Sequence, residues 1–471
     1  MTTIGDKAVH LVYDVLLLAL DLFRDDYQTL FLCSLVNWEF NRVASRFLYS
    51  KVALIPPFRP VLDLKDSGAL PQNSNLGPAS LPRNAPYVLN VEIGGFLSSR
   101  PPPRNTLPVT LTNSIRAFVN LNRIELTPII YHEDTFTETL GVLKEAKSLH
   151  ELAVNACCMD DLRAPLLAKI DGIEKLTLHD PTRAILQLLP DWLERLSNKI
   201  MELHLKDNCG SVTPGVLKSF LPHVRNRLRA FTLGLSYSLT DEDVFNFLGQ
   251  LPKLEMAELK YYWQMKAPPR QPPLPNLRTL TVNSRRLLSK FEVNAICKWI
   301  RRAITWSPIE ELRVIQDEDD DDLFRVTGAH PSWESLIDHL TSRHTQTLRV
   351  LDLRLAFIKA ETLKSLLAKC TALEELYLCA GKDSLGIFSD YSAGLTELYS
   401  VSFEIRNTKR RSYRNLGSNA AADIMRSGPR SLRRLAVNGV EWEGTWILTE
   451  TSDIQFLVQE IKRPKAPWER T

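Results

Sequence analysis

A short hydrophobic pattern recurs along most of the chain: an apolar residue, two intervening residues, a second apolar residue, one intervening residue and a third apolar residue. Its clearest copies begin at Leu149, Ile173 and Ile200. Between Leu121 and Leu277 the first residues of successive copies lie 23 to 28 residues apart. The copies, called triads below, are Val88/Val91/Ile93, Leu121/Ile124/Leu126, Leu149/Leu152/Val154, Ile173/Leu176/Leu178, Ile200/Leu203/Leu205, Leu228/Phe231/Leu233, Leu254/Ala257/Leu259, Leu277/Leu280/Val282, Ile309/Leu312/Val314, Leu348/Leu351/Leu353, Leu373/Leu376/Leu378, Leu432/Leu435/Val437 and a degenerate copy beginning Leu395/Leu398.

A period of this length is typical of leucine-rich repeats, in which each repeat contributes one strand and one returning segment. The segments between the triads have helical patterns. In 240–248, for example, Thr240 is placed to cap a helix whose first turn is acidic. Strand followed by helix, repeated, predicts an α/β fold: a leucine-rich-repeat solenoid with a parallel inner sheet, outer helices and a right-handed horseshoe shape. We assign about 12–13 irregular repeats to residues 87–440.

Two spacings between triads are longer than the others. They separate Ile309 from Leu348 by 39 residues and Leu395 from Leu432 by 37 residues. The first contains an acidic run at 317–322 and the second a basic run at 409–414, and insertions in solenoids form loops. The acidic run fits a solvated loop or a contact for a basic partner, and the basic run fits a nuclear address or a phosphate contact.

Residues 7–55 follow a different pattern. Apolar residues recur at three- and four-residue spacing in three short segments, the first of which extends from Leu11 to Leu22. A polar break at 24–26 separates the first two segments, and Asn37 separates the last two. A short apolar strand at 52–55 follows. The pattern predicts a small domain of three helices, near the lower size limit for a domain that folds alone.

This N-terminal segment resembles an F-box, in particular those of the large fungal families of F-box proteins. The resemblance covers about residues 8–55. It rests on Asp14-Val-Leu-Leu-Leu, Arg24-Asp-Asp-Tyr-Gln-Thr-Leu, Cys33-Ser-Leu-Val-Asn-Trp-Glu-Phe and Arg46-Phe-Leu-Tyr. The family usually opens with Leu-Pro, whereas Leu11 is followed here by Val12 and Tyr13.

The resemblance implies docking onto the Skp1 adaptor of an SCF-type cullin-RING ubiquitin ligase, through an apolar helical surface that meets an apolar groove. The same positions also suit contacts that hold the three helices together. Carried over by position, the Skp1-binding residues implied are Leu11, Val15, Leu16, Leu32, Cys33, Val36 and Phe40.

Proline and glycine mark the region between this domain and the repeats. Residues 56–86 contain seven prolines interleaved with glycine, serine and asparagine, so we predict an extended connector without helix or ladder. At the other end the triads cease, and residues 441–471 are predicted to form a C-terminal cap and a mobile tail. Trp442, Trp446, Phe456 and Leu457 are the candidate capping residues.

Composition narrows the class of protein. The 471 residues are 44% hydrophobic and 24% charged, with a net charge of +3, which is too small to favour nucleic acid or a membrane as the main partner. No apolar run approaches the ~20 residues that span a bilayer. The seven scattered cysteines form no disulfide framework and no zinc-site spacing. These features favour a reduced compartment, the cytoplasm and/or the nucleus.

The sequence contains none of the phosphate-binding, dinucleotide-binding, nucleophile-elbow or zinc-protease motifs. We therefore predict no catalytic residue, no metal and no cofactor. Binding is the better expectation, because the residues between triad members lie on the strand face opposite the core. Tyrosines among charged residues are typical of an interface centre, and the candidate target-binding residues are Asp352, Arg354, Glu375, Tyr377, Glu397 and Tyr399.

Three functional hypotheses follow. The chain is a substrate receptor, whose F-box binds Skp1 and whose repeats hold a protein target for ubiquitination by proximity. Alternatively it is a non-catalytic interaction scaffold whose N-terminal helices never engage Skp1, as the missing Leu-Pro pair allows. A binder of nucleic acid or lipid through the basic run is disfavoured by the small net charge.

Overall fold

The computed structural model describes residues 4–58, 76–101, 105–262, 274–285, 287, 289–316, 332–405, 416–448 and 454–461, except for the side chains of 4–12 and of Leu355. The acidic run at 317–322, the basic run at 409–414 and the tail at 462–471 lie outside the described residues. The chain divides into two units, residues 1–228 and 229–471.

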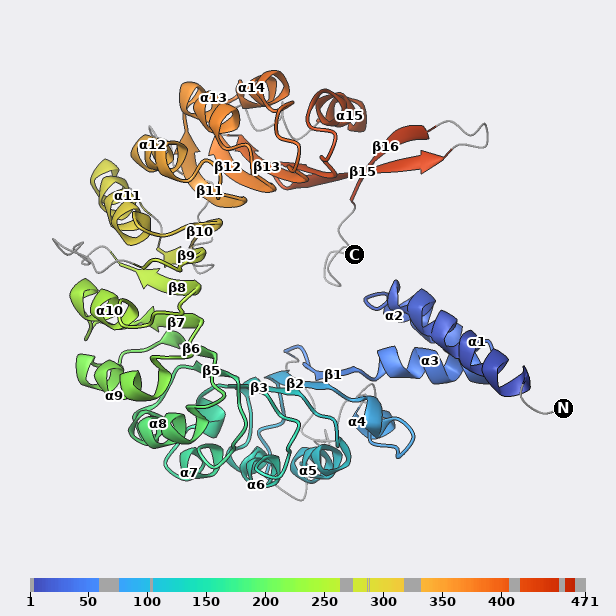
Figure 1. Ribbon diagram of the computed structural model, residues 1–471. Coiled ribbons are helices and arrows are strands. Elements are labelled where there is room, and N and C mark those ends of the chain that lie inside the picture. Colours follow the sequence, from blue (N-terminus) through green and yellow to red (C-terminus); the bar gives the residue numbers. More distant parts are fainter. Residues whose placement is uncertain are drawn as a thin grey trace. The chain divides into compact units, whose positions relative to one another are not determined.

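The first unit begins with three helices, α1 (Ile4–Asp21), α2 (Tyr27–Ser34) and α3 (Trp38–Leu48). Strands β1 (Lys51–Leu54), β2 (Asn90–Phe96), β3 (Arg123–Ile130), β4 (Glu151–Val154), β5 (Lys175–His179) and β6 (Glu202–Asn208) then pair in chain order, every pair parallel. The helices α5 (Leu107–Ala117), α6 (Thr137–Leu143), α7 (Ala164–Leu167), α8 (Arg183–Leu196) and α9 (Pro214–Val224) return the chain along one face of this sheet (Figure 1).

The second unit repeats the arrangement. Strands β7 (Ala230–Leu235), β8 (Met256–Tyr261), β9 (Thr279–Ser284), β10 (Glu311–Gln316), β11 (Val350–Ile358), β12 (Glu375–Ala380), β13 (Ser400–Ile405) and β14 (Arg434–Val437) pair in order and in parallel. Its helices are α10 (Asp241–Leu248), α11 (Lys290–Ile304), α12 (Glu334–Arg343), α13 (Ala360–Lys369), α14 (Ser384–Tyr391) and α15 (Ser418–Ser427). The prediction of an α/β fold on a mostly parallel sheet is confirmed, and the horseshoe shape stays a prediction.

The triads form the core of both units. Each residue of the twelve complete triads is at most 5% exposed. In register, Leu152 pairs with Leu176 and Val154 with Leu178, so equivalent triad positions stack on one another. Burial of one such aliphatic side chain contributes about 1.5–3 kcal/mol. Because neighbouring repeats bury their triads against each other, the stack is stabilised along its length rather than around one centre.

The helices begin where the sequence places capping residues. The hydroxyl of Thr240 accepts a hydrogen bond from the backbone N–H of Asp243 over 3.2 Å, and the Asp243 carboxylate accepts one from the Thr240 backbone N–H over 2.9 Å. This reciprocal pair fixes the start of α10. Helix α9 begins at Pro214, whose missing N–H costs nothing in the first turn.

The structure corrects the prediction for the region that joins the helices to the repeats. The strand expected at 52–55 is β1, and it pairs in parallel with β2, so the sheet begins inside residues 7–55. The expected connector at 56–86 contains a helix, α4 (Leu76–Ala79), and a 3-10 turn at Ala85–Tyr87. Leu76 and Ala79 are buried, and α4 contacts α5 and β1. Burial of these apolar side chains therefore stabilises a short helix despite the prolines nearby. Residues 59–75 lie outside the described part of the chain.

A second correction concerns the triad assigned as degenerate. Strand β13 pairs Val401 with Leu376 and Phe403 with Leu378, so the complete triad is Leu398/Val401/Phe403, and all three are buried. Leu395 is also buried but lies in the preceding turn, where its N–H bonds to Ser392. Two apolar residues three apart fit either register, and the third position, Phe403, decides between them.

The parallel order ends in a hairpin. Strand β15 (Val440–Leu448) pairs antiparallel with β14, and β16 (Ile454–Glu460) pairs antiparallel with β15. Of the predicted capping residues, Trp442 is buried, whereas Trp446 is exposed and contacts Phe456 at 4.9 Å between ring centres. None of the described helices has the length and apolar content needed to cross a bilayer.

Candidate functional site

Side-chain N-caps fix where the second and third N-terminal helices begin. The Asp26 carboxylate accepts from the backbone N–H of Thr29 over 3.0 Å and starts α2. The Asn37 side-chain oxygen accepts from the N–H of Phe40 over 3.0 Å and starts α3. The hydrogen bonds from Thr29 lower the pKa of Asp26, so this cap is ionised and in place at neutral pH.

A small core holds these helices together. Leu20, Leu30, Val43 and Ala44 are buried at its centre. Around them pack the half-buried side chains of Tyr13, Leu16, Leu17, Cys33, Phe47 and Leu48. Two residues implied as Skp1-binding, Leu16 and Cys33, therefore contact the core of the segment. The guanidinium of Arg42 lies 4.7 Å from the ring centre of Tyr13 and ties α3 to α1.

Other implied residues face outward. Val15, Leu32 and Val36 have relative exposures between 56% and 62%. Phe40 is half-buried, and the side chain of Leu11 lies outside the described residues. The sequence prediction missed further apolar side chains that are 49% to 84% exposed. We define the exposed helical surface as Val15, Leu18, Leu22, Phe31, Leu32, Leu35, Val36 and Trp38.

The spacing of the members on α1 places them together on one face of the helix. Val15, Leu18 and Leu22 are three and four residues apart, so they share one face of α1. Leu30 and Val43 complete the core from the other helices. Three short helices need only a few apolar residues to form their core. Apolar residues in excess of these are left exposed and indicate an interaction surface. That count of apolar residues is the sequence signal that finds the additional members.

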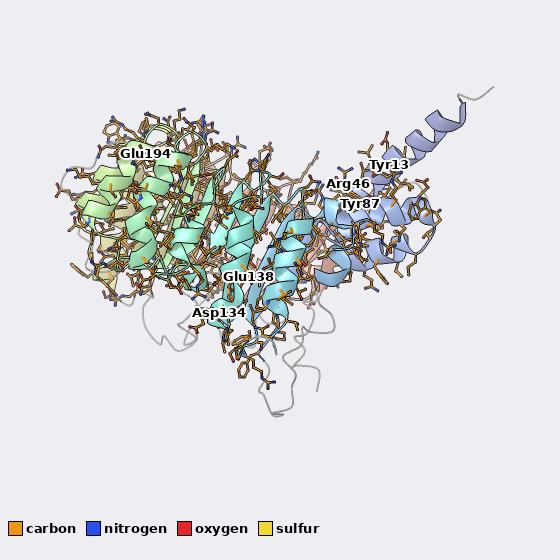
Figure 2. The ribbon with its side chains drawn as sticks, turned by 90° about the horizontal axis from the view of Figure 1, so that it is seen from below. Tyr13, Arg46, Tyr87, Asp134, Glu138 and Glu194 are labelled. Carbon is orange, nitrogen blue, oxygen red and sulfur yellow. The ribbon has the colours of Figure 1, made fainter. Side chains whose placement is uncertain are left out.

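Figure 2 shows where this segment meets the repeats. Tyr13 and Arg46 lie on α1 and α3, and Tyr87 lies in the 3-10 turn before β2. Helix α3 contacts this turn. Asp134, Glu138 and Glu194 lie on or beside the outer helices of the same unit (Figure 2). The helical segment is therefore continuous with the first repeat.

The predicted target-binding residues lie on strands β11 and β12. Asp352 is 2% exposed, and its two carboxylate oxygens accept from Nε and Nη2 of Arg354 over 3.1 and 2.7 Å. The guanidinium of Arg354 also lies over the ring of Tyr377, 5.2 Å from its centre. The Asp352 carboxylate raises the pKa of Arg354. The exposed arginine is thus held flat against the sheet by a bidentate pair and an aromatic face.

Glu375 joins the two tyrosines of this group. Its Oε2 accepts a hydrogen bond from the Tyr377 hydroxyl over 2.8 Å, and its Oε1 accepts one from the Tyr399 hydroxyl. That second hydrogen bond raises the pKa of Tyr399 to about 12, while burial raises the pKa of Tyr377. Five of the six predicted residues therefore form one connected group: Asp352, Arg354, Glu375, Tyr377 and Tyr399.

Glu397 is not part of this group. The corrected register places it in the turn before β13, where it accepts a hydrogen bond from Thr396. Tyr399 likewise precedes the strand, and it reaches Glu375 only through its long side chain. The sequence position that continues the row of Asp352 and Tyr377 is Ser402. We call the connected five residues the sheet patch.

The sheet patch offers orientation and charge rather than a reacting centre. The Asp352 carboxylate accepts hydrogen bonds from Arg354, and the Glu375 carboxylate accepts them from Tyr377 and Tyr399. The hydrogen-bonding groups of the patch are therefore held in fixed positions. Among the described residues, one group of three ligand-type side chains lies within 4.8 Å, His132, Glu133 and Asp134. These are consecutive residues of one surface turn with both carboxylates exposed, and exposed acidic groups of this kind are common without an ion.

No family model matches this chain, and no curated protein matches it. Among solved structures, the crystal structure of a complex of Rad7 and Elc1 in yeast is similar, with a TM-score of 0.42 and 14% sequence identity. The likeness covers 86% of this chain and 93% of that chain. At this level of similarity it carries no argument about function, which rests on the residues described above.

Proposed function

We propose that this chain is the substrate-recognition subunit of an SCF-type ubiquitin ligase. In this proposal the N-terminal helices are an F-box that docks on a Skp1 adaptor, and the repeats bind a protein target. The chain contributes no catalytic group and no cofactor; it acts in the cytoplasm and/or the nucleus by raising the target's local concentration near the ubiquitin-loaded enzyme.

The exposed helical surface is the observation that carries the proposal. This small helical segment has its own core, yet the eight apolar side chains of the exposed helical surface remain in water. Exposed apolar surface of this kind marks a protein–protein interface. It also lies on the residues that resemble an F-box, since Leu35 and Val36 belong to Cys33-Ser-Leu-Val, the most specific part of that resemblance. An apolar groove on the partner is the surface that such helices fit.

Binding of purified Skp1 to the full-length chain tests this half of the proposal. Val15→Asp and Val36→Asp place a charge on the exposed helical surface without entering the core, so both variants should fold and bind at least tenfold more weakly. Val119→Asp is the matched control, because Val119 is 65% exposed in the same unit but lies after α5. The proposal fails if the parent chain does not bind Skp1, or if all three variants bind like the parent.

The sheet patch supports the second half, target binding. Arg354 and the tyrosines are pre-organised by their own contacts, so a partner that binds them pays little side-chain entropy. Arg and Tyr are also the residues enriched in interface hot spots. We expect Arg354→Glu and Tyr377→Ala to remove specific proteins from those that co-purify with the full chain, while Skp1 remains. Loss of Skp1 together with every other protein would instead indicate unfolding.

A non-catalytic scaffold is the second candidate, and one observation favours it. Strand β1 follows α3 after two residues and pairs with β2 over four residue pairs. The helices are therefore attached to the first repeat, as a cap would be. In this alternative the exposed helical surface binds another protein, and Skp1 is absent from the co-purifying set.

A further inference from the structure

The last strand of the sheet has a free edge. Strand β16 pairs with β15 along its whole length, from Ile454 opposite Leu448 to Glu460 opposite Trp442. Among the described residues, no strand pairs with the other edge of β16. Its outward N–H and C=O groups are available to a further strand, which is the usual route by which a sheet recruits another chain.

This edge carries none of the features that keep other edge strands from pairing. Natural edges are protected by lysine, proline, bulges or short length. Residues 454–460 contain no lysine, arginine, proline or glycine, and their register with β15 shows no shift. The one charge, Glu460, is at the end of the strand. An unprotected edge of seven residues is a surface suited to pairing.

The side chains beside this edge are apolar. Ile454 is 70% exposed. Leu457, also on β16, and Ile461, just after its end, are exposed as well. Trp446 and Leu448, near the free end of β15, add to this surface. Helix α15 contacts both strands and covers part of one face of the hairpin. Figure 1 shows the hairpin extending beyond that helix, so no helix of the described residues in this unit covers its outer half.

The residue pattern of β16 fits a second copy of itself. In an antiparallel pair centred on Leu457, that residue faces its own equivalent, Phe456 faces Val458, and Gln455 faces Gln459. Amide opposes amide and apolar opposes apolar, and no like charges are opposed, because Glu460 faces Ile454. A self-complementary surface is what a two-fold dimer requires. We propose that two copies of this chain pair through β16 in this register, forming one sheet across the dimer.

Cysteine cross-linking tests the register in the full-length chain. Directly opposed residues in an antiparallel pair bring their Cβ atoms to about 4.5–5.5 Å, close enough for a disulfide after a small adjustment. Six of the seven native cysteines are buried, and Cys33 is half-buried, so the variants are made in a Cys33→Ser background. We expect Leu457→Cys to cross-link with itself, and Gln455→Cys to cross-link efficiently only when mixed with Gln459→Cys. Phe291→Cys, at a 79% exposed site on α11, measures chance collisions.

Sedimentation over a range of concentrations tests the pairing without added thiols. The parent should form dimers as concentration rises, and Leu457→Lys should shift the equilibrium at least tenfold toward the monomer, because two lysines then oppose each other. Phe291→Lys should leave it unchanged. A parent that stays monomeric throughout, a dimer indifferent to Leu457→Lys, or cross-linking no faster than Phe291→Cys would overturn the proposal. Each result is independent of Skp1 binding, so it leaves the proposed function untouched.

Discussion

The indole nitrogen of Trp299 donates a hydrogen bond to Oδ1 of Asp241 over 2.8 Å, and both side chains are buried although they are 58 residues apart. The other oxygen of Asp241, Oδ2, is buried and accepts no hydrogen bond within the described part of the chain. Burial raises the pKa of Asp241 to about 6, and the bond from Trp299 opposes this only in part. The ionised carboxylate is therefore poorly accommodated at the start of α10.

The stability of the second unit should depend on this carboxyl group. The folded pKa of about 6 lies above the ordinary 3.8, so the group's contribution is complete at low pH and is lost as the pH rises from 3.8 to 6. Asp241→Asn keeps the acceptor for Trp299 and removes the charge. We expect it to raise the unfolding free energy near pH 8 by about 1–2 kcal/mol. Urea titration of both proteins measures this, and a variant less stable than the parent would contradict it.

Two histidines predict a pH dependence of opposite sign. The rings of His339 and His344 are 5.4 Å apart, and the Nε2 atom of each is buried without a hydrogen-bond partner in the described structure. Burial lowers the pKa of His339 to about 4, assisted by repulsion from His344, Arg301 and Arg343. Burial, with repulsion from Arg343, also lowers the pKa of His344.

Because the folded pKa of His339 lies below its ordinary 6.5, stability from this group is complete above 6.5 and falls as the pH drops toward 4. The Asp241→Asn background removes the opposing effect of that carboxyl group. In it, the urea concentration at the unfolding midpoint should decrease as the pH is lowered from about 7 to about 5. His339→Gln should flatten that dependence, while His223→Gln on α9 should preserve it. An equal slope in all three proteins would exclude the histidine pair as its source.

Gly95 provides a test of the junction between β1 and β2. Its φ is +66°, and a Cβ added there would lie 2.4 Å from the backbone oxygen of Pro56. Gly95→Ala should therefore lower the unfolding free energy by about 1–3 kcal/mol or more. Gly141→Ala in α6, where nothing lies within 4 Å, should raise it by about 0.5–1 kcal/mol. Calorimetry distinguishes the two, and equal effects would be inconsistent with this geometry.

Arg354 should be stabilising as well as available to a partner. Arg354→Ala would leave the buried Asp352 without its bidentate partner, so we expect a loss of about 1–3 kcal/mol in the second unit. Arg354→Lys keeps the charge but not the paired geometry and should recover only part of the loss. In the Asp352→Asn background the cost of Arg354→Ala should shrink. A cost unchanged by that background would show that the pair is not coupled.

The sequence was sufficient for the repeats because their signal is periodic. Positions such as Leu152 and Leu176 recur with the same spacing inside each triad and stack in the structure, so one rule locates the strands from β2 to β12. The same rule failed at Leu395, where burial in a turn imitates the first residue of a triad. Glu397 was misplaced with it. Sequence alone does not separate two buried leucines three residues apart.

The candidate surfaces were harder to predict than the fold. Asp352 lies on the strand face opposite the core, yet it is almost fully buried. The Arg354 guanidinium covers it, and Tyr377 lies beside it on the neighbouring strand. Leu16 is next to Val15 on α1, and Cys33 is three residues before Val36, but Leu16 and Cys33 pack inward. Which side of a short helix faces the core depends on its neighbours, and that information is not in the spacing.

Hydrogen exchange of the full-length chain, with and without purified Skp1, tests the central claim most directly. We expect slower amide exchange in α2 and in the turn leading to α3, with a smaller effect in the second half of α1, and no change in β11 or β12. Unchanged exchange throughout residues 13–38, or protection confined to the repeats, would contradict it.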